Sequence, residues 1–225
     1  MPFVEVPEEV RWRIVSDDNA AGDPSAVLSR DELARLASFG HPDRRRGFEF
    51  GRIAARSLLA ELLGVAPVDV PLVVARDDGL VVEGHPVHVS ISHAGHGPSA
   101  QSIAVIAARP IGVDLEEIVP RREDLYRRIL HTDEYGMLEL LNLPHNEAQI
   151  LLWSLKEAVL KGLRTGFRRS AQSVHLDDIS DGTGHAHVGD GPPWNLRFAR
   201  LEGFWATLAY LDQKTAGPSV LESVS

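Results

Sequence analysis

The same order of predicted elements occurs twice along this 225-residue chain, and no other feature of the sequence restricts the fold as much. In each half, a helix cap is followed by a helix, a second helix and a pair of strands. Ser29 and Thr132 are the two caps, and the second helices contain Arg52 and Lys156. Corresponding positions lie about one hundred residues apart, which is typical of an internal repeat. We therefore predict two similar α+β halves that form an intramolecular pseudo-dimer.

Local signals support these elements in the first half. Ser29 and Glu32 have the spacing of a capping box. Residues 50–64 have apolar side chains at helical spacing and end on a glycine, as many helices do. Residues 87–92 alternate between apolar and polar, which indicates a half-buried strand, and 102–107 is predicted as the partner strand of a hairpin.

The second half begins with another predicted strand. The elements expected there are the strand 111–116, the helix 153–163 and the paired strands 194–200 and 204–211. We place the halves at residues 1–110 and 111–225, each with helices packed on a small antiparallel sheet. The cleft between two such halves is the expected ligand site.

Composition excludes several classes of protein. The formal net charge of −9 argues against a general nucleic-acid binder, which needs a basic surface. No apolar run approaches the ~20 residues that cross a bilayer, and residues 1–9 are acidic and lack the pattern of a signal peptide. The absence of cysteine excludes disulfides and thiolate metal sites. We expect a soluble, cytoplasmic protein that binds neither membranes nor nucleic acid.

One helix combines lysine with a carboxylate in a chain whose cations are mostly arginine. Lys156 and Lys161, two of the three lysines, flank Glu157. Compact ammonium groups beside a carboxylate suit a site where phosphate charge is met and a proton is moved. Trp153, Glu157 and Lys161 follow one another at i, i+4 along one ridge. An ordinary surface Glu–Lys pair, with Trp153 in the core, would explain the same residues.

Asp114 and Glu116 lie two residues apart on a predicted strand, so their side chains project from the same face. Paired carboxylates without cysteine suit a hard cation such as Mg²⁺. Glu157 could supply a third carboxylate from the helix. The alternative is an acidic strand end that faces water.

Ser92 and His93 close a predicted strand, and Gly95 and Gly97 follow, so that the backbone can approach a ligand closely. We interpret His93 as a donor to phosphate. A hydrolytic Ser–His dyad is not expected, because adjacent side chains point apart and no Gly-x-Ser-x-Gly motif occurs. A zinc site remains open as an alternative, although its spacing matches no known zinc motif. Its candidate ligands are His85, His88, His93 and His96, with His185 and His187 in reserve.

Three motifs together resemble the Sfp-type 4′-phosphopantetheinyl transferases in order and spacing. They are Ser90-Ile91-Ser92-His93, Gly112-Val113-Asp114-Leu115-Glu116 and Trp153-Ser154-Leu155-Lys156-Glu157-Ala158 with Lys161. The resemblance extends weakly to Gly51-Arg52, Gly84-His85-Pro86 and Thr132-Asp133-Glu134, and it fades after Arg169. It therefore covers most of the chain, and the combination of motifs is specific although each one is short.

The resemblance implies a pseudo-dimeric fold that binds coenzyme A and Mg²⁺ between its halves. The family moves the phosphopantetheine arm of coenzyme A onto a serine of an apo carrier protein and releases adenosine 3′,5′-bisphosphate. By resemblance, Asp114, Glu116 and Glu157 would hold the metal. Glu157 would take the serine proton, directly or through water, and Lys161, with Lys156, would stabilise phosphate charge.

The resemblance also implies contacts to coenzyme A. The residues expected to bind it are Arg52, Ser92, His93, Lys156 and Lys161, with His85 and Arg76 as further candidates. His85 stands where the family commonly has lysine, and it is mostly neutral at pH 7. Arg76 or the cluster around Arg44 would then compensate.

The partner implied is an apo acyl, peptidyl or aryl carrier protein, and an internal pseudo-dimer is expected to act as a monomer. We predict a basic-rimmed apolar groove for a carrier helix. It would comprise Arg121, Arg122, Arg127 and Arg128 beside Leu125, Ile129, Met137 and Leu138. Two alternatives stay open: a Mg²⁺-dependent phosphohydrolase of a nucleotide-like substrate, and a non-catalytic module that binds acidic helical partners.

Overall fold

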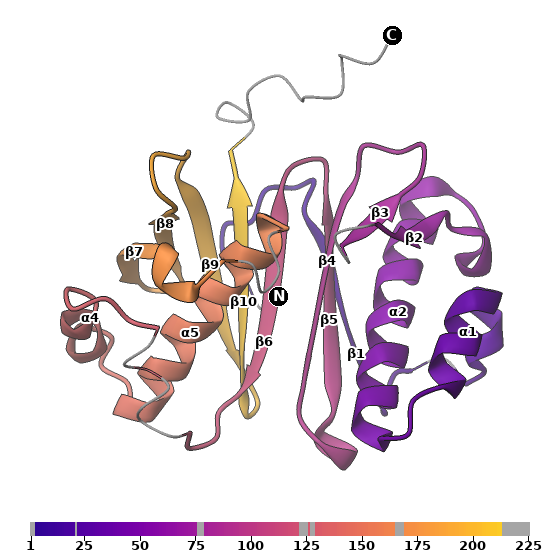
Figure 1. The fold of residues 1–225 in the computed structure, drawn as a ribbon, viewed down its shortest axis with the longest axis horizontal. Helices are drawn as coiled ribbons and strands as arrows, with labels where there is room; N and C mark the ends of the chain where they lie inside the picture. The colour runs from indigo at the N-terminus through magenta and orange to yellow at the C-terminus, as the bar shows by residue number, and fades with distance from the viewer. Residues whose placement is uncertain are drawn as a thin grey trace, which may run out of the picture.

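Two five-stranded antiparallel sheets lie face to face, and each is covered by helices on its outer side (Figure 1). This arrangement comes from a computed structural model that describes residues 3–20, 22–75, 79–121, 126, 129–164 and 169–212. The strand orders are β1-β5-β4-β3-β2 and β6-β10-β9-β8-β7. The predicted α+β class is confirmed.

The strands of the first sheet and the two helices that accompany it lie within residues 11–107. Its elements are β1 (Arg11–Ser16), α1 (Arg30–Ala37), α2 (Pro42–Leu63), β2 (Leu72–Val74), β3 (Leu80–Val82), β4 (His88–Ala94) and β5 (Gln101–Ala107). Short 3-10 helices connect them at η1 (Pro24–Ala26), η2 (Pro67–Asp69) and η3 (Gly97–Ser99).

The second sheet starts at residue 111 and is covered mainly by one long helix. Its elements are β6 (Ile111–Glu117), α4 (Tyr135–Leu140), α5 (His145–Gly162), η5 (Ala171–Ser173), β7 (His175–Ser180), β8 (Thr183–His187), β9 (Trp194–Leu201) and β10 (Phe204–Leu211). Among the described residues, no helix is long and apolar enough to cross a membrane.

The structure confirms one of the two predicted helix caps and contradicts the other. Ser29 forms the predicted capping box, because its hydroxyl accepts from the Glu32 amide at 3.3 Å and the Glu32 carboxylate accepts from the Ser29 amide at 3.0 Å. The prediction that Thr132 opens a helix is wrong: residues 132–134 form a turn and α4 begins at Tyr135. The Glu134 side chain provides no cap, because its carboxylate is buried in an ion pair with Lys156.

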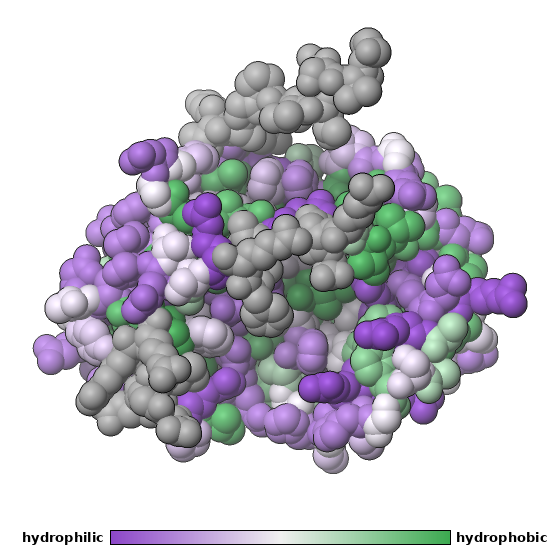
Figure 2. Space-filling model, in the orientation of Figure 1, coloured by the Kyte–Doolittle hydropathy of each residue, from purple (hydrophilic) through white to green (hydrophobic). Residues whose placement is uncertain are grey.

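Successive side chains of strand β6 alternate between the core that joins the two sheets and the face covered by α5. Ile111, Val113 and Leu115 are buried in the core between the two sheets. The intervening residues face α5, which packs on β6 and β10. Further cores lie between α2 and the first sheet and between α5 and the second. On the face shown in Figure 2, hydrophilic residues predominate along the lower edge and the left side.

The closest approach between α5 and β6 is made possible by Gly112. A β-carbon added there would lie 1.9 Å from the Ala158 carbonyl oxygen and 2.4 Å from the Gly162 amide nitrogen. Both neighbours are backbone atoms, so no side-chain rotation can relieve the overlap. Gly112 therefore sets how near α5 comes to the polar residues of β6.

We predict that Gly112→Ala lowers the free energy of unfolding by about 3 kcal/mol or more, since overpacking against backbone shifts the whole helix. Urea denaturation measures this change. Gly136→Ala in α4 is the matched control, because its added β-carbon meets no atom within 4 Å. We expect the control to be neutral or slightly stabilising. Equal stability of both variants would contradict the close packing of α5 on β6.

Candidate active site

A buried carboxylate, Asp114, forms the centre of the polar site between β6 and α5. Only 3% of its surface is exposed. Its Oδ1 atom accepts hydrogen bonds from the Lys161 ammonium at 2.6 Å and from the Ser92 hydroxyl at 2.9 Å, and its Oδ2 atom accepts from the Ser154 hydroxyl at 2.8 Å. Lys161 also donates to Ser92 Oγ at 2.7 Å. Because Ser92 belongs to the first sheet, this cluster joins the two halves.

Glu116 lies beside Asp114 on the same face of β6. Its carboxylate accepts a hydrogen bond from the indole of Trp153 on α5 at 2.9 Å and forms an ion pair with Arg121. Burial and then the negative charge of Asp114 raise the pKa of Glu116, while Arg121, Trp153 and Lys161 oppose the shift.

Glu157 on α5 completes the acidic group. Burial and the negative charge of Asp114 raise the pKa of Glu157 to about 7, with Glu116 adding to the shift and Lys161 opposing it. The structure thus brings Asp114, Glu116, Glu157 and Lys161 into one electrostatically coupled cluster. A carboxyl group that titrates near neutral pH is suited to accept and release a proton.

His93, at the end of β4, connects this cluster to an open cleft. Its ring lies against Gly47 of α2, where an added β-carbon would be 2.5 Å from His93 Cδ2. The loss of surrounding water and the charge of Lys161 lower the pKa of His93, with Asp114 opposing, and the side chain keeps an exposed face. The imidazole is therefore neutral at pH 7 and can donate one N–H group.

The cleft has a volume of about 980 Å³ and is lined by residues of both halves. Its walls are formed by His41, Asp43, Arg44, His93, Ala94, Gly95, His96, Glu116, Glu117, Val119 and Arg121. The lining therefore combines three carboxylates with two guanidinium groups and three histidines. A cleft of this size is large enough for a nucleotide-like ligand.

Lys156 was predicted to act with Lys161, but the structure places the two ammonium groups on different sides of α5. The Lys156 side chain is fully buried, forms an ion pair with Glu134 at 2.6 Å, and donates to the carbonyl oxygens of Ile129 at 3.1 Å and Val174 at 2.8 Å. These three acceptors use all three ammonium hydrogens. Lys156 is therefore not brought to the Asp114 cluster, and we do not retain it as a catalytic or cofactor-binding residue.

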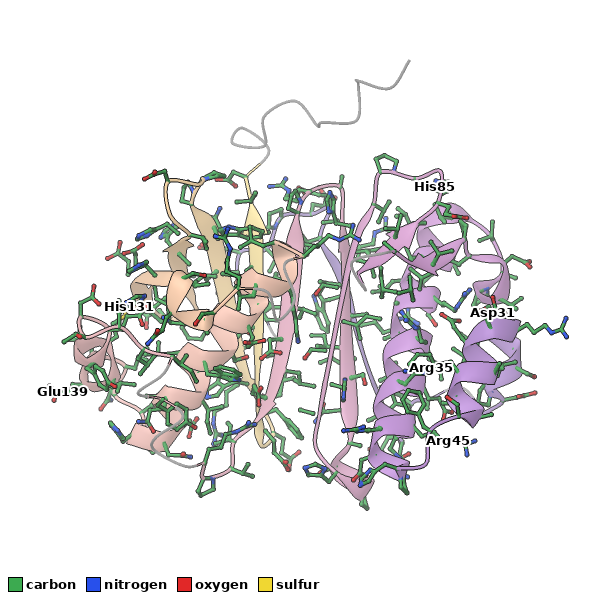
Figure 3. All side chains as sticks on the ribbon, in the orientation of Figure 1. Asp31, Arg35, Arg45, His85, His131 and Glu139 are labelled. Atoms are coloured by element: carbon green, nitrogen blue, oxygen red, sulfur yellow. The ribbon has the colours of Figure 1, made fainter. Side chains whose placement is uncertain are left out.

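Two other predicted contacts to coenzyme A also lie away from the cleft. Arg52 forms an ion pair with Glu32 at 3.4 Å, its guanidinium lies 5.1 Å from the centre of the Phe48 ring, and it lines a separate cavity. His85 lies in the turn between β3 and β4, at the opposite end of the first half from Arg45 (Figure 3). Arg76 is outside the described residues.

The structure gives no support to the zinc alternative. Within the described part of the chain, no three His, Cys, Asp or Glu side chains are placed to hold a metal ion together. The acidic cluster does not form such a group either, and Lys161 is paired with Asp114 and Arg121 with Glu116. The donors nevertheless fit Mg²⁺ in kind. They are carboxylates in which burial and then mutual negative charge raise the pKa of Glu157, and a divalent cation would relieve that charge.

Two residues of the site were not found from the sequence. Ser154 lies inside a recognised motif, yet a small polar residue in a helix carries little signal. Thr207 is fully buried in β10, whose residues are all buried. A hydroxyl residue amid the apolar run Phe204–Leu211 is the only signal that could have pointed to it.

A carboxylate cluster, a lysine and a neutral histidine beside a cleft are suited to chemistry on phosphate groups. Comparison with known proteins identifies the family. The profile of the 4′-phosphopantetheinyl transferase superfamily matches residues 110–210. The chain is 32% identical over 193 residues to the 4′-phosphopantetheinyl transferase HetI of Nostoc sp., covering 82% of this chain and 79% of that protein. The chain therefore belongs to the 4′-phosphopantetheinyl transferase family, and the resemblance to its Sfp-type members is confirmed.

Other similar proteins have related names. A 4′-phosphopantetheinyl transferase of Bacillus subtilis is 24% identical over 169 residues, which is 74% of this chain and 73% of that protein. The crystal structure of a holo-[acyl-carrier-protein] synthase from Thermotoga maritima aligns at 24% identity with a TM-score of 0.40, covering 46% of this chain and 62% of that one. Neither the phosphohydrolase nor the non-catalytic module is supported by the named relatives.

We predict that Glu157 makes the protein less stable as pH rises. Its folded-state pKa of about 7 lies above the ordinary value of 4.5, so between these values the folded state holds a proton that the unfolded chain has lost. The free energy of unfolding therefore falls as pH rises from about 4.5 to 7 and this contribution is constant above that range. Urea denaturation at several pH values, with a chelator present, measures the slope.

The test compares two Glu→Gln variants. Glu157→Gln is expected to flatten the decline of stability with pH, because the titrating group is gone. Glu139→Gln, which removes an exposed carboxylate from α4 (Figure 3), is expected to keep the wild-type slope. An unchanged slope in Glu157→Gln would show that this carboxyl group does not titrate near neutral pH.

Proposed function

We propose that this chain transfers the 4′-phosphopantetheine arm of coenzyme A to a serine of an apo carrier protein and releases adenosine 3′,5′-bisphosphate. The family supports the activity. The observation that carries the assignment of the site is the cluster of Asp114, Glu116, Glu157 and Lys161, which lies beside a cleft lined by both halves.

Mg²⁺ is the metal that we propose for this site, with Asp114, Glu116 and Glu157 as its ligands. The donors are all carboxylates, and Mg²⁺ is commonly held by one or two of these together with substrate phosphate. When bound, the ion would supply positive charge to the phosphate oxygens.

Glu157 and Lys161 have distinct proposed roles in the transfer. The serine oxygen of the carrier forms a bond to the β-phosphorus of coenzyme A, and the bond from that phosphorus to the bridging oxygen breaks. Glu157 takes the serine proton, directly or through water. The partly exposed Lys161 ammonium stabilises negative charge on the departing phosphate.

The cleft between residues 1–110 and 111–225 is the proposed site for coenzyme A. His93 can donate its N–H group to a phosphate, with Ser92 beside it, and Arg44 and His96 line the same space. We assign to Arg44 the charged contact predicted for Arg52, because Arg52 and His85 both lie elsewhere. Both halves of one chain form this cleft, so we propose that the protein acts as a monomer in the cytoplasm.

Carrier docking is proposed for the surface that follows β6. Arg122, Leu125, Arg127 and Arg128 of the predicted groove lie outside the described residues. Ile129 and Leu138 are wrong as groove residues, because both are buried in the core of the second half. Leu140, 82% exposed, and Tyr135, 38% exposed, present apolar surface on α4 instead.

We predict that the transfer depends on a divalent cation and on Asp114. Mg²⁺ should support transfer of a labelled pantetheine arm to an apo carrier, and a chelator should abolish it. Asp114→Ala should lower kcat at least ~100-fold, since it removes a ligand and leaves Lys161 without its counter-charge. Asp190→Ala removes an exposed carboxylate of the second half and should change kcat little. A loss below threefold in Asp114→Ala would remove Asp114 from the site.

We predict that docking depends on the arginines after β6. The double variant Arg127→Glu with Arg128→Glu should raise KM for an acidic carrier at low salt and leave KM for coenzyme A unchanged. The reason is that the introduced glutamates repel the acidic carrier as it approaches. The effect should diminish at high salt. Arg11→Glu with Arg13→Glu, on β1 of the first half, is the matched charge reversal. An unchanged carrier KM in the first variant would place docking elsewhere.

A further inference from the structure

Two fully buried hydroxyl groups lie directly beneath Asp114. Thr207 of β10 is the cross-strand partner of Asp114 on β6, so their side chains share the face that α5 covers. Ser154 of α5 lies between them. Both Ser154 and Thr207 have no exposed surface. Buried hydroxyls need hydrogen-bond partners, and here each one finds its partners within this group.

The distances define a chain of hydrogen bonds. Ser154 Oγ lies 2.8 Å from Asp114 Oδ2 and 2.8 Å from Thr207 Oγ1. Thr207 Oγ1 also lies 2.9 Å from the Ser154 carbonyl oxygen. An ionised carboxylate only accepts, so the single hydroxyl hydrogen of Ser154 must go to Asp114. The hydrogen of Thr207 is then the only one available for Ser154 Oγ and the Ser154 carbonyl.

We infer that Thr207 and Ser154 form a hydroxyl relay that fixes the orientation of the Asp114 carboxylate, which makes both of them positioning residues for the transfer. The inference rests on the proposed function. Thr207 touches neither substrate nor metal in this arrangement. It acts through Ser154, because its single hydroxyl hydrogen is shared between the hydroxyl and carbonyl oxygens of that residue.

The relay matters because the other contacts to Asp114 all reach one oxygen. Lys161 and Ser92 both donate to Oδ1, whereas Oδ2 is held by Ser154. Without the Ser154 contact, the carboxylate is held through Oδ1 alone. The relay thus supplies the hydrogen bond that holds the second oxygen. A carboxylate held at both oxygens is pre-organised for a cation.

Binding of Mn²⁺, a stand-in for Mg²⁺, tests the relay without turnover. We expect Thr207→Val, which keeps the shape of the side chain and removes the hydroxyl, to raise the Kd for Mn²⁺ about tenfold. Electron paramagnetic resonance of free Mn²⁺ measures this Kd in protein without coenzyme A. Thr207→Ser retains the hydroxyl and should stay within about twofold of wild type.

A double-mutant cycle separates the relay from general loss of stability. Ser154→Ala should weaken Mn²⁺ binding about as much as Thr207→Val, and the double variant should be no weaker than Ser154→Ala alone, because both changes break one chain of bonds. Thermal melting verifies that each variant is folded. If Thr207→Val fails to fold, Ser154→Ala and Thr207→Ser still give the comparison.

Several outcomes would overturn the inference. They are wild-type Mn²⁺ affinity in Thr207→Val or in Ser154→Ala, additive losses in the double variant, and failure of Thr207→Ser to restore affinity. Transfer to an apo carrier is measured on the same wild-type sample. Normal transfer with unaltered Mn²⁺ binding in the variants contradicts the relay alone, whereas a wild-type protein that neither transfers nor binds Mn²⁺ contradicts the proposed function as well.

Discussion

The contact of Asp114 with Lys161 and Ser92 is the interaction on which the rest of the site depends. It joins a strand and a helix of the second half to a strand of the first, and the carboxylate at its centre is almost completely buried. A buried ion pair adds little stability unless its remaining hydrogen-bonding positions are satisfied, and it is costly to break. Here every oxygen of the carboxylate has a donor. The pair therefore favours one relative position of β4, β6 and α5, and with it one shape of the cleft.

Strand β6 makes this arrangement possible because its two faces differ. Its apolar residues build the core that joins the two sheets, while Gly112, Asp114 and Glu116 face α5. The missing side chain at Gly112 lets the helix approach until Ser154 can reach Asp114 and Trp153 can reach Glu116. The same close packing removes water from the carboxylates. That loss of hydration, together with their mutual repulsion, is the cause of the raised pKa of Glu157.

Periodicity accounts for the parts of the fold and site that the sequence predicts. Alternation along a strand places Asp114 and Glu116 on one face, and helical spacing places Glu157 and Lys161 on one ridge. The first helix cap is also local, and its prediction is confirmed. Contacts between distant segments are not local. The role of Lys156 depends on Glu134 and on two carbonyls from other segments. Thr207 reaches Asp114 through pairing of β10 with β6, and it reaches Ser154 through packing of α5 on β10. No spacing within one element contains that information.

The two lysines of α5 show how one residue type meets two different needs. Lys156 is fully buried, and its three donors match three acceptors that converge from separate segments, including a carboxylate that also accepts from the amides of His131 and Leu176. Lys161 keeps 31% of its side chain exposed and holds Asp114 and Ser92 with part of its donor capacity. A compact ammonium fits both positions, whereas the planar guanidinium of arginine would not fit the tetrahedral set around Lys156. In a chain whose cations are mostly arginine, these two lysines mark places where geometry, and not charge alone, selects the cation.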